Sequence, residues 1–329
     1  MKIFAGIDGG GTQTRLALAD ENGALLSFAK APSCSFVENG LEVARERLDA
    51  LWRAAWKKTG QPGRAVEALF MGMGSILAPH DARINCELAV SLEFVRPNRV
   101  RAENDAFNAL AGGLCGRPGI LLISGTGSAC FGRNAQGKTW RAGGWGYRLH
   151  DPGSAYAFGL AAIIAVTRQA DKRGQPTALT AVVREALGIR EIADIFRRVH
   201  SEKFDRADVA SLAPLVVETA ARSDQVARRI LTENADALVE MVLTVARELE
   251  LPKPELALTG GLITGAKEFR RVFLERLEAA LPGFRVAEGG FPPALGAVLL
   301  ACELATGEKA PVKFLENLRA SSAAMVELA

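Results

Sequence analysis

The sequence has few of the residues and patterns that mark metal clusters, nucleic-acid binders or membrane proteins. It has only 3 histidines, so a histidine-built metal site is not expected. The 5 cysteines lie far apart without paired spacing, which predicts buried free thiols in a reducing, cytoplasmic setting. A net charge of +3 is small for 329 residues, so no nucleic-acid partner is expected.

Long hydrophobic runs are also missing. The longest one, around residues 157–166, is too short to cross a bilayer, so no membrane partner is expected. No cleavable leader is expected either, because the first strand already begins near Lys2. With 49% apolar and 23% charged residues, the chain has the composition of an ordinary globular protein with room for two cores.

The first stretch with a chemical signature runs from Ile3 to Asp20. Apolar residues alternate before Asp8, three glycines follow, and the alternation resumes at Leu16, which predicts a β-hairpin. Its turn offers bare N–H groups and polar side chains to an anion, from Gly10, Gly11, Thr12, Gln13 and Thr14. Asp8 ends the first strand, where a carboxylate can hold hydrated Mg²⁺ against a polyphosphate. The alternative is a tight hairpin with an exposed aspartate.

The first hundred residues predict a mixed sheet with helices on its faces. Further strands are expected at 23–29, 66–71 and 99–102, with a loop at 32–39 and helices at 41–59, 81–92 and 106–112. Asn104 and Asp105 stand between the last strand and the last helix. Asp105 is therefore either a functional carboxylate or simply the N-cap of that helix.

A second round of the same pattern begins at Gly119. A strand at 120–123, a turn of glycines and hydroxyl residues at 124–128 and a return strand at 129–132 repeat the opening order. Two such turns, facing each other from related halves, would hold a nucleotide in a cleft between domains. Residues 132–139 match the P-loop pattern, but no helix is expected after them, so a hairpin turn is the better interpretation.

The rest of the chain is mainly helical. A glycine-rich segment at 143–155 precedes the expected helices, which are 156–168, 179–187, 191–200, 207–221 and a long helix from Asp224 capped by Ser223. A strand at 255–258 delivers Gly260 and Gly261 to a helix start, where the backbone can approach a flat group such as adenosine. A short strand at 284–287, a helix from Pro292 to Leu304 and a helical tail from Pro311 follow.

These motifs, in this order and spacing, resemble the superfamily of sugar kinases, heat-shock chaperone ATPases and actin. More narrowly, they resemble the family that joins N-acetylglucosamine kinases with BadF/BadG/BcrA/BcrD ATPases. The resemblance covers nearly the whole chain. It implies an α/β fold of two ribonuclease H-like (actin-like ATPase) domains with a nucleotide cleft between them. The implied N-terminal domain is 1–112, with the C-terminal helix at about 311–329 a candidate to pack back onto it, and the C-terminal domain is 113–310, with a helical insertion at about 154–250.

The resemblance also implies residue roles. Asp105 would be the general base and Asp8 would organise Mg²⁺. The ATP-binding residues would be Gly10, Gly11, Thr12, Gln13, Thr14, Gly125, Thr126, Gly127, Gly260 and Gly261. The sugar would be contacted by Ser35, Asn104, Asp105, Thr126, Gly144, Trp145, Asp151 and Ala155.

The implied activity is an ATP-dependent kinase of an amino sugar, with N-acetylglucosamine (at its 6-hydroxyl) or glucosamine as acceptor. Two departures bear on the sugar: Pro152 replaces a glutamate of the family pattern, and the loop at 33–36 lacks the asparagine that N-acetylglucosamine kinases place there. One alternative is an activating ATPase for an acyl-CoA dehydratase or reductase, which would carry an iron–sulfur cluster. Another is a non-catalytic sugar-binding regulator, for which a start at the first strand leaves no room for a DNA-binding module. Assembly as a homodimer is left open.

Overall fold

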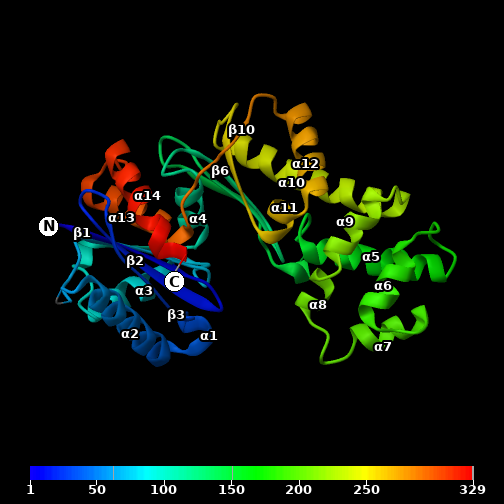
Figure 1. Ribbon diagram of the computed structural model, residues 1–329, viewed down its shortest axis with the longest axis horizontal. Coiled ribbons are helices and arrows are strands. Elements are labelled where there is room, and N and C mark those ends of the chain that lie inside the picture. The colour runs from blue at the N-terminus through cyan, green and yellow to red at the C-terminus, as the bar shows by residue number, and fades with distance from the viewer. Residues whose placement is uncertain (62, 150, 328–329) are drawn as a thin grey trace. The chain divides into compact units, whose positions relative to one another are not determined.

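The computed structural model describes residues 1–61, 63–149 and 151–327 and divides them into two compact units (Figure 1). Unit 1 comprises residues 1–117 and 287–329, and unit 2 comprises residues 118–286. His150 of the expected glycine-rich segment and residues 328–329 of the expected C-terminal helix lie outside the described residues.

Unit 1 is built on a five-stranded sheet in the order β3-β2-β1-β4-β5. Its strands are β1 Ile3–Gly9, β2 Gln13–Asp20, β3 Leu25–Pro32, β4 Ala68–Met73 and β5 Val100–Glu103. The first three strands pair antiparallel, whereas β4 runs parallel to β1 and β5 parallel to β4. Every residue of β1 is buried, as expected for a strand in the centre of a sheet that is covered on both faces.

Helices cover both faces of this sheet. They are α1 Phe36–Asn39, α2 Leu41–Thr59, α3 Pro79–Ser91, α4 Ala106–Gly113, α13 Pro293–Thr306 and α14 Val312–Glu327, with a 3₁₀ turn at Pro97–Arg99. Alternate residues of β1 point to opposite faces, so Ile3, Ala5 and Ile7 join a core with α2 and α3. Phe4 joins a second core with α13 and with Phe314 of α14.

Unit 2 repeats this topology in the order β10-β9-β6-β7-β8. Its strands are β6 Gly119–Ser124, β7 Ser128–Arg133, β8 Thr139–Gly143, β9 Glu255–Thr259 and β10 Arg285–Val286. Again three successive strands pair antiparallel and two later strands add in parallel. The repeated order confirms the α/β class, two ribonuclease H-like units and the duplication expected from the sequence.

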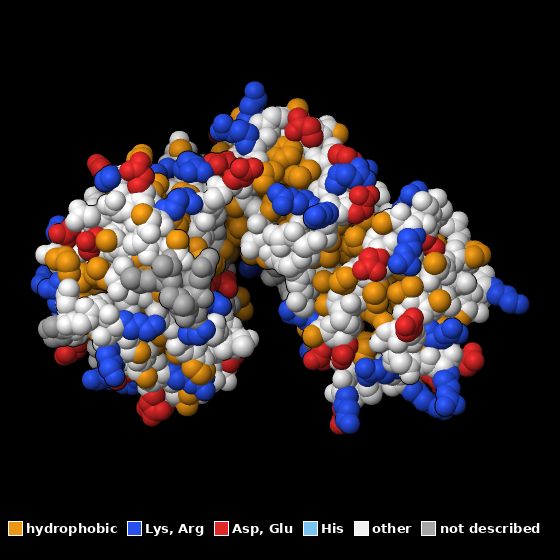
Figure 2. Space-filling model, viewed as in Figure 1, with side chains coloured by type: hydrophobic (Ala, Val, Ile, Leu, Met, Phe, Trp, Pro, Cys, Tyr) orange, Lys and Arg blue, Asp and Glu red, His pale blue; other side chains and the backbone are white. Residues whose placement is uncertain are grey.

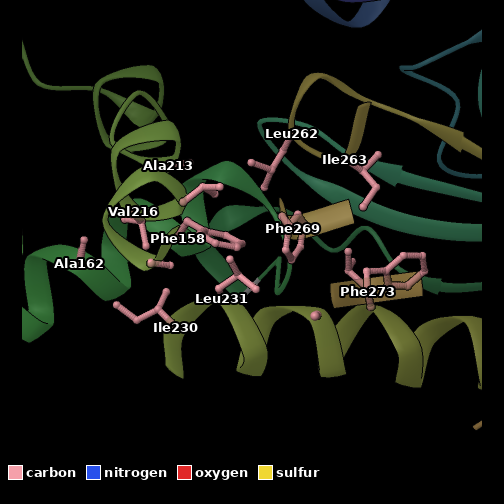
Figure 3. Close-up of a cluster of buried hydrophobic side chains, with 14 of the residues drawn as sticks. Phe158, Ala162, Ala213, Val216, Ile230, Leu231, Leu262, Ile263, Phe269 and Phe273 are labelled. Atoms are coloured by element: carbon pink, nitrogen blue, oxygen red, sulfur yellow. The ribbon is translucent and has the colours of Figure 1, made fainter. Parts of the chain in front are cut away.

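The helices of unit 2 enclose its core. They are α5 Ala155–Ala170, α6 Leu179–Leu187, α7 Ile195–Val199, α8 Arg206–Ala210, α9 Ala213–Ala221, α10 Gln225–Glu248, α11 Gly261–Gly265 and α12 Lys267–Ala280, with 3₁₀ turns at Tyr147–Leu149 and Ile192–Asp194. Phe158 of α5 and Phe269 of α12 meet edge to face with ring centroids 4.8 Å apart (Figure 3). Val216 and Ile230 bring α9 and α10 into the same cluster.

Several elements differ from the sequence-based expectation. The division into units places residues 287–310 in unit 1 and not in the C-terminal domain, because α13 packs against β1, β4 and α4. The expected helix at 207–221 is interrupted after Ala210, where Pro214 falls in the first turn of α9 and cannot continue a preceding helix. The expected helix at 191–200 is a 3₁₀ turn followed by the short α7. The loop at 32–39 contains the single-turn α1.

The N-cap of the long helix α10 also differs from the expected Ser223. The cap is Asp224, whose carboxylate accepts the Ala227 N–H at 2.9 Å, while Ser223 has a φ of 73° and precedes the helix. Asp224 also accepts the Ala178 N–H at 2.7 Å, so one carboxylate holds the starts of both α6 and α10. The sequence pattern predicted the cap of α10 at Ser223 and not at Asp224. It gave no indication that Asp224 also holds the start of α6.

Other features agree with the sequence. The P-loop-like segment is the β7–β8 hairpin, closed by a 3.0 Å hydrogen bond from Asn134 N to Lys138 O. All five cysteines, which lie in described parts of the chain, are free thiols. None of the described helices combines the length and the apolar character that a membrane span requires. On the face shown in Figure 2, acidic and basic side chains are interspersed, in keeping with the small net charge.

Candidate functional site

In unit 1, the turn between β1 and β2 forms the first expected phosphate-binding hairpin. Gly10 N donates to Gln13 O at 2.9 Å, and Gly11 and Thr12 are exposed at the tip. Thr14 differs from the others: its side chain is buried, and its hydroxyl accepts the Cys34 N–H at 2.9 Å. The tip is therefore open to an anion, whereas the Thr14 hydroxyl already serves to hold the next loop.

The loop from Ser33 to Asn39 braces this hairpin. Ser33 N donates to Thr12 O at 3.0 Å and Ser33 Oγ donates to Gly10 O at 2.9 Å. Asn39 Nδ2 in turn donates to the carbonyls of Ser33 and Ser35 at 3.3 and 3.0 Å. Ser35 is only 3% exposed, and its Oγ has no partner within the described part of the protein. A buried hydroxyl without a partner is costly, which makes Ser35 an exception within this otherwise hydrogen-bonded loop.

Asp8 lies at the end of β1 beside this hairpin. One carboxylate oxygen, Oδ1, accepts from Asn108 Nδ2 at 3.1 Å, and the other, Oδ2, lies 3.7 Å from Arg15 Nη1. Burial raises the pKa of Asp8, while Asn108 and Arg15 act against that shift. Arg15 faces Asp8 because the two residues are direct partners in the β1–β2 register. Neither Arg15 nor Asn108 was expected from the sequence to belong to the site.

Asp105 stands at the start of α4 in the same unit. Its side chain makes no capping hydrogen bond. Instead Asn104 Oδ1 accepts the Ala106 N–H at 3.1 Å, and Asn104 Nδ2 donates to Ile76 O at 3.1 Å. Burial, and after it the negative charge of Asp8, raise the pKa of Asp105 to about 6. Asn104 thus makes the capping hydrogen bond of α4, while the backbone N–H groups of Ala106 and Asp105 partly offset the rise in the pKa of the Asp105 carboxyl group.

In unit 2, the turn between β6 and β7 forms the second hairpin. Gly125 N donates to Gly127 O at 2.9 Å and Thr126 is exposed at the tip. Three hydrogen bonds fix the turn at 151–155 to it: Ser124 Oγ to Gly153 O at 2.6 Å, Ser128 Oγ to Pro152 O at 2.7 Å, and Ala155 N to Gly125 O at 2.7 Å. The departure at Pro152 leaves this arrangement intact, because Pro152 contributes its carbonyl.

Asp151 connects the same turn to the loop that carries Trp145. Asp151 is 5% exposed, and its Oδ1 accepts the Gly146 N–H at 3.0 Å. Trp145 itself is 67% exposed, with the Arg141 guanidinium 4.8 Å from its ring centroid. An exposed aromatic ring on a fixed loop offers an apolar face to a sugar ring. Gly144 directly follows β8, and Ala155 is the first residue of α5.

A pocket of about 720 Å³ opens beside the second hairpin, entirely within unit 2. Gly125, Thr126, Ala155 and Gly261, all expected site residues, form part of its lining. The rest comes from α8, α9 and the start of α12, at Ala207, Ala210, Ser211, Ala213, Pro214, Val217, Glu218, Leu262, Gly265, Ala266 and Lys267. The volume and mainly apolar lining suit a planar heterocycle, and Glu218 and Lys267 add polar groups at its wall.

Gly260 is the structural reason that this pocket lies against the second hairpin. It follows β9 with a φ of 103°, which favours glycine, and a side chain there would meet Ser124 O at 2.4 Å. The next residue, Gly261, begins α11, and a Cβ at that position would have no neighbouring atom within 4 Å. Gly260 therefore serves close backbone packing, and Gly261 faces open space in the pocket.

The residues around Asp8 fit a magnesium ion. Mg²⁺ keeps several waters and is held by one or two carboxylates together with phosphates, and Asp8 and Asp105 are the carboxylates that unit 1 brings to this end of the sheet. Among the described residues there is no group of three or more His, Cys, Asp or Glu side chains that could hold a metal without such a ligand. The donor set thus suits a metal that arrives with a polyphosphate.

The structure brings the expected residues into two groups, one in each unit. Unit 1 groups Asp8, the residues of the first hairpin, Ser35, Asn104 and Asp105. Unit 2 groups the second hairpin, Gly144, Trp145, Asp151, Ala155, Gly260 and Gly261. The pocket wall from α8 and α9 carried no usable sequence signal, because small apolar residues on a helix normally indicate packing.

Comparison with known proteins identifies similar sequences and solved structures. An N-acetylmuramic acid/N-acetylglucosamine kinase of Clostridium acetobutylicum is 32% identical over 304 residues, which cover 92% of this chain and 98% of that protein. An N-acetyl-D-glucosamine kinase of Dictyostelium discoideum is 29% identical over 91% of this chain and 98% of its own length. A solved structure from Chromobacterium violaceum, provisionally assigned as an N-acetylglucosamine kinase, superimposes with a TM-score of 0.65 at 26% identity and covers 92% of this chain and 99% of its own.

The family profile of the BadF/BadG/BcrA/BcrD ATPases matches residues 5–301, which include both hairpins, Asp105 and the β9–α11 glycines. The chain therefore belongs to the BadF/BadG/BcrA/BcrD ATPase family.

Proposed function

We propose that this protein is an ATP-dependent kinase that transfers the γ-phosphoryl group to a hydroxyl of an amino sugar. N-acetylglucosamine, at its 6-hydroxyl, and glucosamine are the acceptors we place first, and the relatives named above, which are kinases of N-acetylated amino sugars, favour N-acetylglucosamine. Because ATP is the donor, the proposal places the activity in the cytoplasm. The observation that carries the proposal is the state of the Asp105 carboxyl group. It is half-buried, makes no capping hydrogen bond and has its pKa raised to about 6.

Both units contribute to ATP binding in this proposal. Gly10 to Thr14 and Gly125 to Gly127 bind the phosphates through backbone N–H groups and the exposed Thr12 and Thr126 hydroxyls. Gly261 lies against the adenosine, which occupies the pocket between α9 and α11, and Gly260 allows the close packing beside it. Mg²⁺, when bound at Asp8, neutralises charge on the phosphates. Arg15 adds a cation beside Asp8.

The sugar contacts come from both groups of residues. Ser35 offers its unpartnered Oγ, and Asn104 retains one amide hydrogen beyond its bond to Ile76. Trp145, Gly144, Asp151, Thr126 and Ala155 supply the contacts of unit 2. Asp105 accepts the proton of the attacking hydroxyl, and phosphoryl transfer otherwise depends on positioning and charge neutralisation.

The alternative of an iron–sulfur activator is disfavoured. Cys34, Cys130 and Cys302 are buried, and burial raises the pKa of the Cys130 thiol, which opposes the thiolate that a cluster needs. The free Asp105 carboxylate likewise favours catalysis over a sugar-binding regulator without activity.

Acceptor specificity can be tested with a coupled ADP-release assay across N-acetylglucosamine, glucosamine, N-acetylmuramic acid and glucose, with mass spectrometry of the products. We expect ADP formation that depends on an amino sugar and gives the sugar 6-phosphate. ATP turnover that no sugar stimulates would contradict the proposal.

Replacing Asp105 tests the general base. Asp105→Asn keeps the size of the side chain but cannot accept the proton, so the kcat should fall by roughly 10²–10⁴-fold while ATP affinity stays within about threefold. Asp81→Asn is the matched control, because Asp81 is a buried carboxylate of the same unit that caps α3. Full sugar phosphorylation by Asp105→Asn would remove Asp105 from this role.

The pH profile should show the ionisation of this base. Asp105 accepts a proton only when ionised, so kcat/KM for the sugar should fall tenfold per pH unit below its pKa and level off above it. That pKa is raised to about 6 in the protein without ligands. A positive metal ion near Asp8 would offset part of the shift, so the midpoint with MgATP should lie between about 4 and about 6. A level profile down to about pH 4 in folded protein would contradict this expectation.

The nucleotide pocket can be blocked without disturbing the fold. Gly261→Val places a side chain where no atom lies within 4 Å of the Cβ, so folding should be unaffected. Because Gly261 lines the pocket, the added methyl groups should weaken ATP binding by at least about tenfold, or 1.4 kcal/mol. Calorimetric titration with ATP measures the loss, and Ala280→Val, at the exposed end of α12, is the control. Unchanged ATP affinity in Gly261→Val would place the adenosine elsewhere.

A further inference from the structure

Asn108 links α4 to the Asp8 carboxylate through a side-chain hydrogen bond. It is fully buried, at 0% exposure, one turn after Asp105 on α4. Its Nδ2 lies 3.0 Å from Ile7 O, 3.1 Å from Asp8 Oδ1 and 3.4 Å from Gly72 O. An amide nitrogen has two hydrogens, and the two shortest contacts go to β1. The side chain therefore holds both the backbone and the carboxylate at the end of that strand.

The surroundings leave Asn108 little freedom. A Cβ on Gly72 would come within 2.1 Å of Asn108 Nδ2, so the glycine in β4 makes the room that this amide occupies. On the other side of α4, a Cβ on Gly296 would lie 2.1 Å from Asn108 O, because α13 packs directly on the α4 backbone. Asn108 is held between β4 and α13 in a position where it can donate to Asp8.

The two oxygens of Asp8 consequently have different partners. Oδ1 is held by Asn108, while Oδ2 has the half-exposed Arg15 at 3.7 Å. The Oδ1 end of the carboxylate is thus held by α4, the helix whose N-cap residue is Asp105. Residues three apart on a helix lie on one face, so a single rigid element determines the placement of both carboxylates.

We propose that Asn108 is a positioning residue that fixes the Asp8 carboxylate for binding of magnesium nucleotide. This inference rests on the proposed kinase function, in which Asp8 organises the metal. Without the Asn108 amide, the Asp8 side chain can rotate about its bonds, and the metal-dependent part of nucleotide binding is lost while the metal-independent contacts of the hairpin remain.

The test uses Asn108→Leu, which keeps the size of the side chain and removes its donor, and a matched control. Asn85→Leu is that control: Asn85 is also a fully buried asparagine of unit 1, and its Nδ2 donates to Asp81 O at 2.9 Å, away from Asp8. Its Oδ1, like that of Asn108, has no partner within the described part of the protein. Binding of a non-hydrolysable ATP analogue is measured by calorimetry on the full-length protein, in EDTA and over a series of Mg²⁺ concentrations.

We expect affinity in EDTA to be equal in wild type and both variants within about threefold, and the gain on adding Mg²⁺ to be reduced at least tenfold only in Asn108→Leu. If this variant does not fold, as judged by its melting transition, Asn108→Ala removes the donor without adding bulk and carries the same expectation. A wild-type Mg²⁺ response in a folded Asn108 variant, or an equal loss in Asn85→Leu, would overturn the positioning role. A wild-type protein whose nucleotide binding ignores Mg²⁺ would instead overturn the proposed function.

Discussion

The close packing of α4 and α13 on the sheet of unit 1 is the constraint on which the candidate site depends. A Cβ on Gly6 of β1 would lie 2.5 Å from Ala294 O, and one on Gly296 would lie 2.1 Å from Asn108 O. Interiors packed this closely cannot adjust by small shifts. Because α13 packs closely on both β1 and α4, it holds α4 where Asn108 reaches Asp8 and where Asp105 lies near Asp8.

Each unit attaches a segment expected to bind sugar to a hairpin expected to bind phosphate. In unit 1, Ser33 holds Thr12 and Gly10 by backbone and side-chain hydrogen bonds. In unit 2, the turn at 151–155 is held to the β6–β7 hairpin by three hydrogen bonds. The duplicated fold thus joins such a segment to a hairpin in each unit, with different residues making the hydrogen bonds.

Much of this structure could be predicted from the sequence, and the failures have physical causes. Period-two alternation and glycine turns identified the strands and both hairpins, because central strands and tight turns impose strong local patterns. The position of α13 could not be predicted, because its nearly all-apolar sequence shows that it is buried but not against which sheet. The pocket wall on α8 and α9 was missed for a related reason, since alanines and prolines that face a ligand look like alanines and prolines that face a core. The role of Asn108 was not predicted, because a single asparagine within a helix forms no recognisable motif with other residues of the sequence.

The environments of Asp8 and Asp105 explain why two carboxylates at one end of a sheet can have different roles. Asp8 receives an amide hydrogen bond and a nearby guanidinium, both of which favour its ionised form. Burial raises the pKa of both carboxyl groups, but Asp105 also lies near the negative charge of Asp8, and the two effects together raise its pKa to about 6. Asp8, with these two donors beside it, suits a cation, and Asp105, with its pKa raised to about 6, suits a base. The Asn108 amide is one of the groups that separate the two environments, because it favours the ionised form of Asp8 and does not act on Asp105.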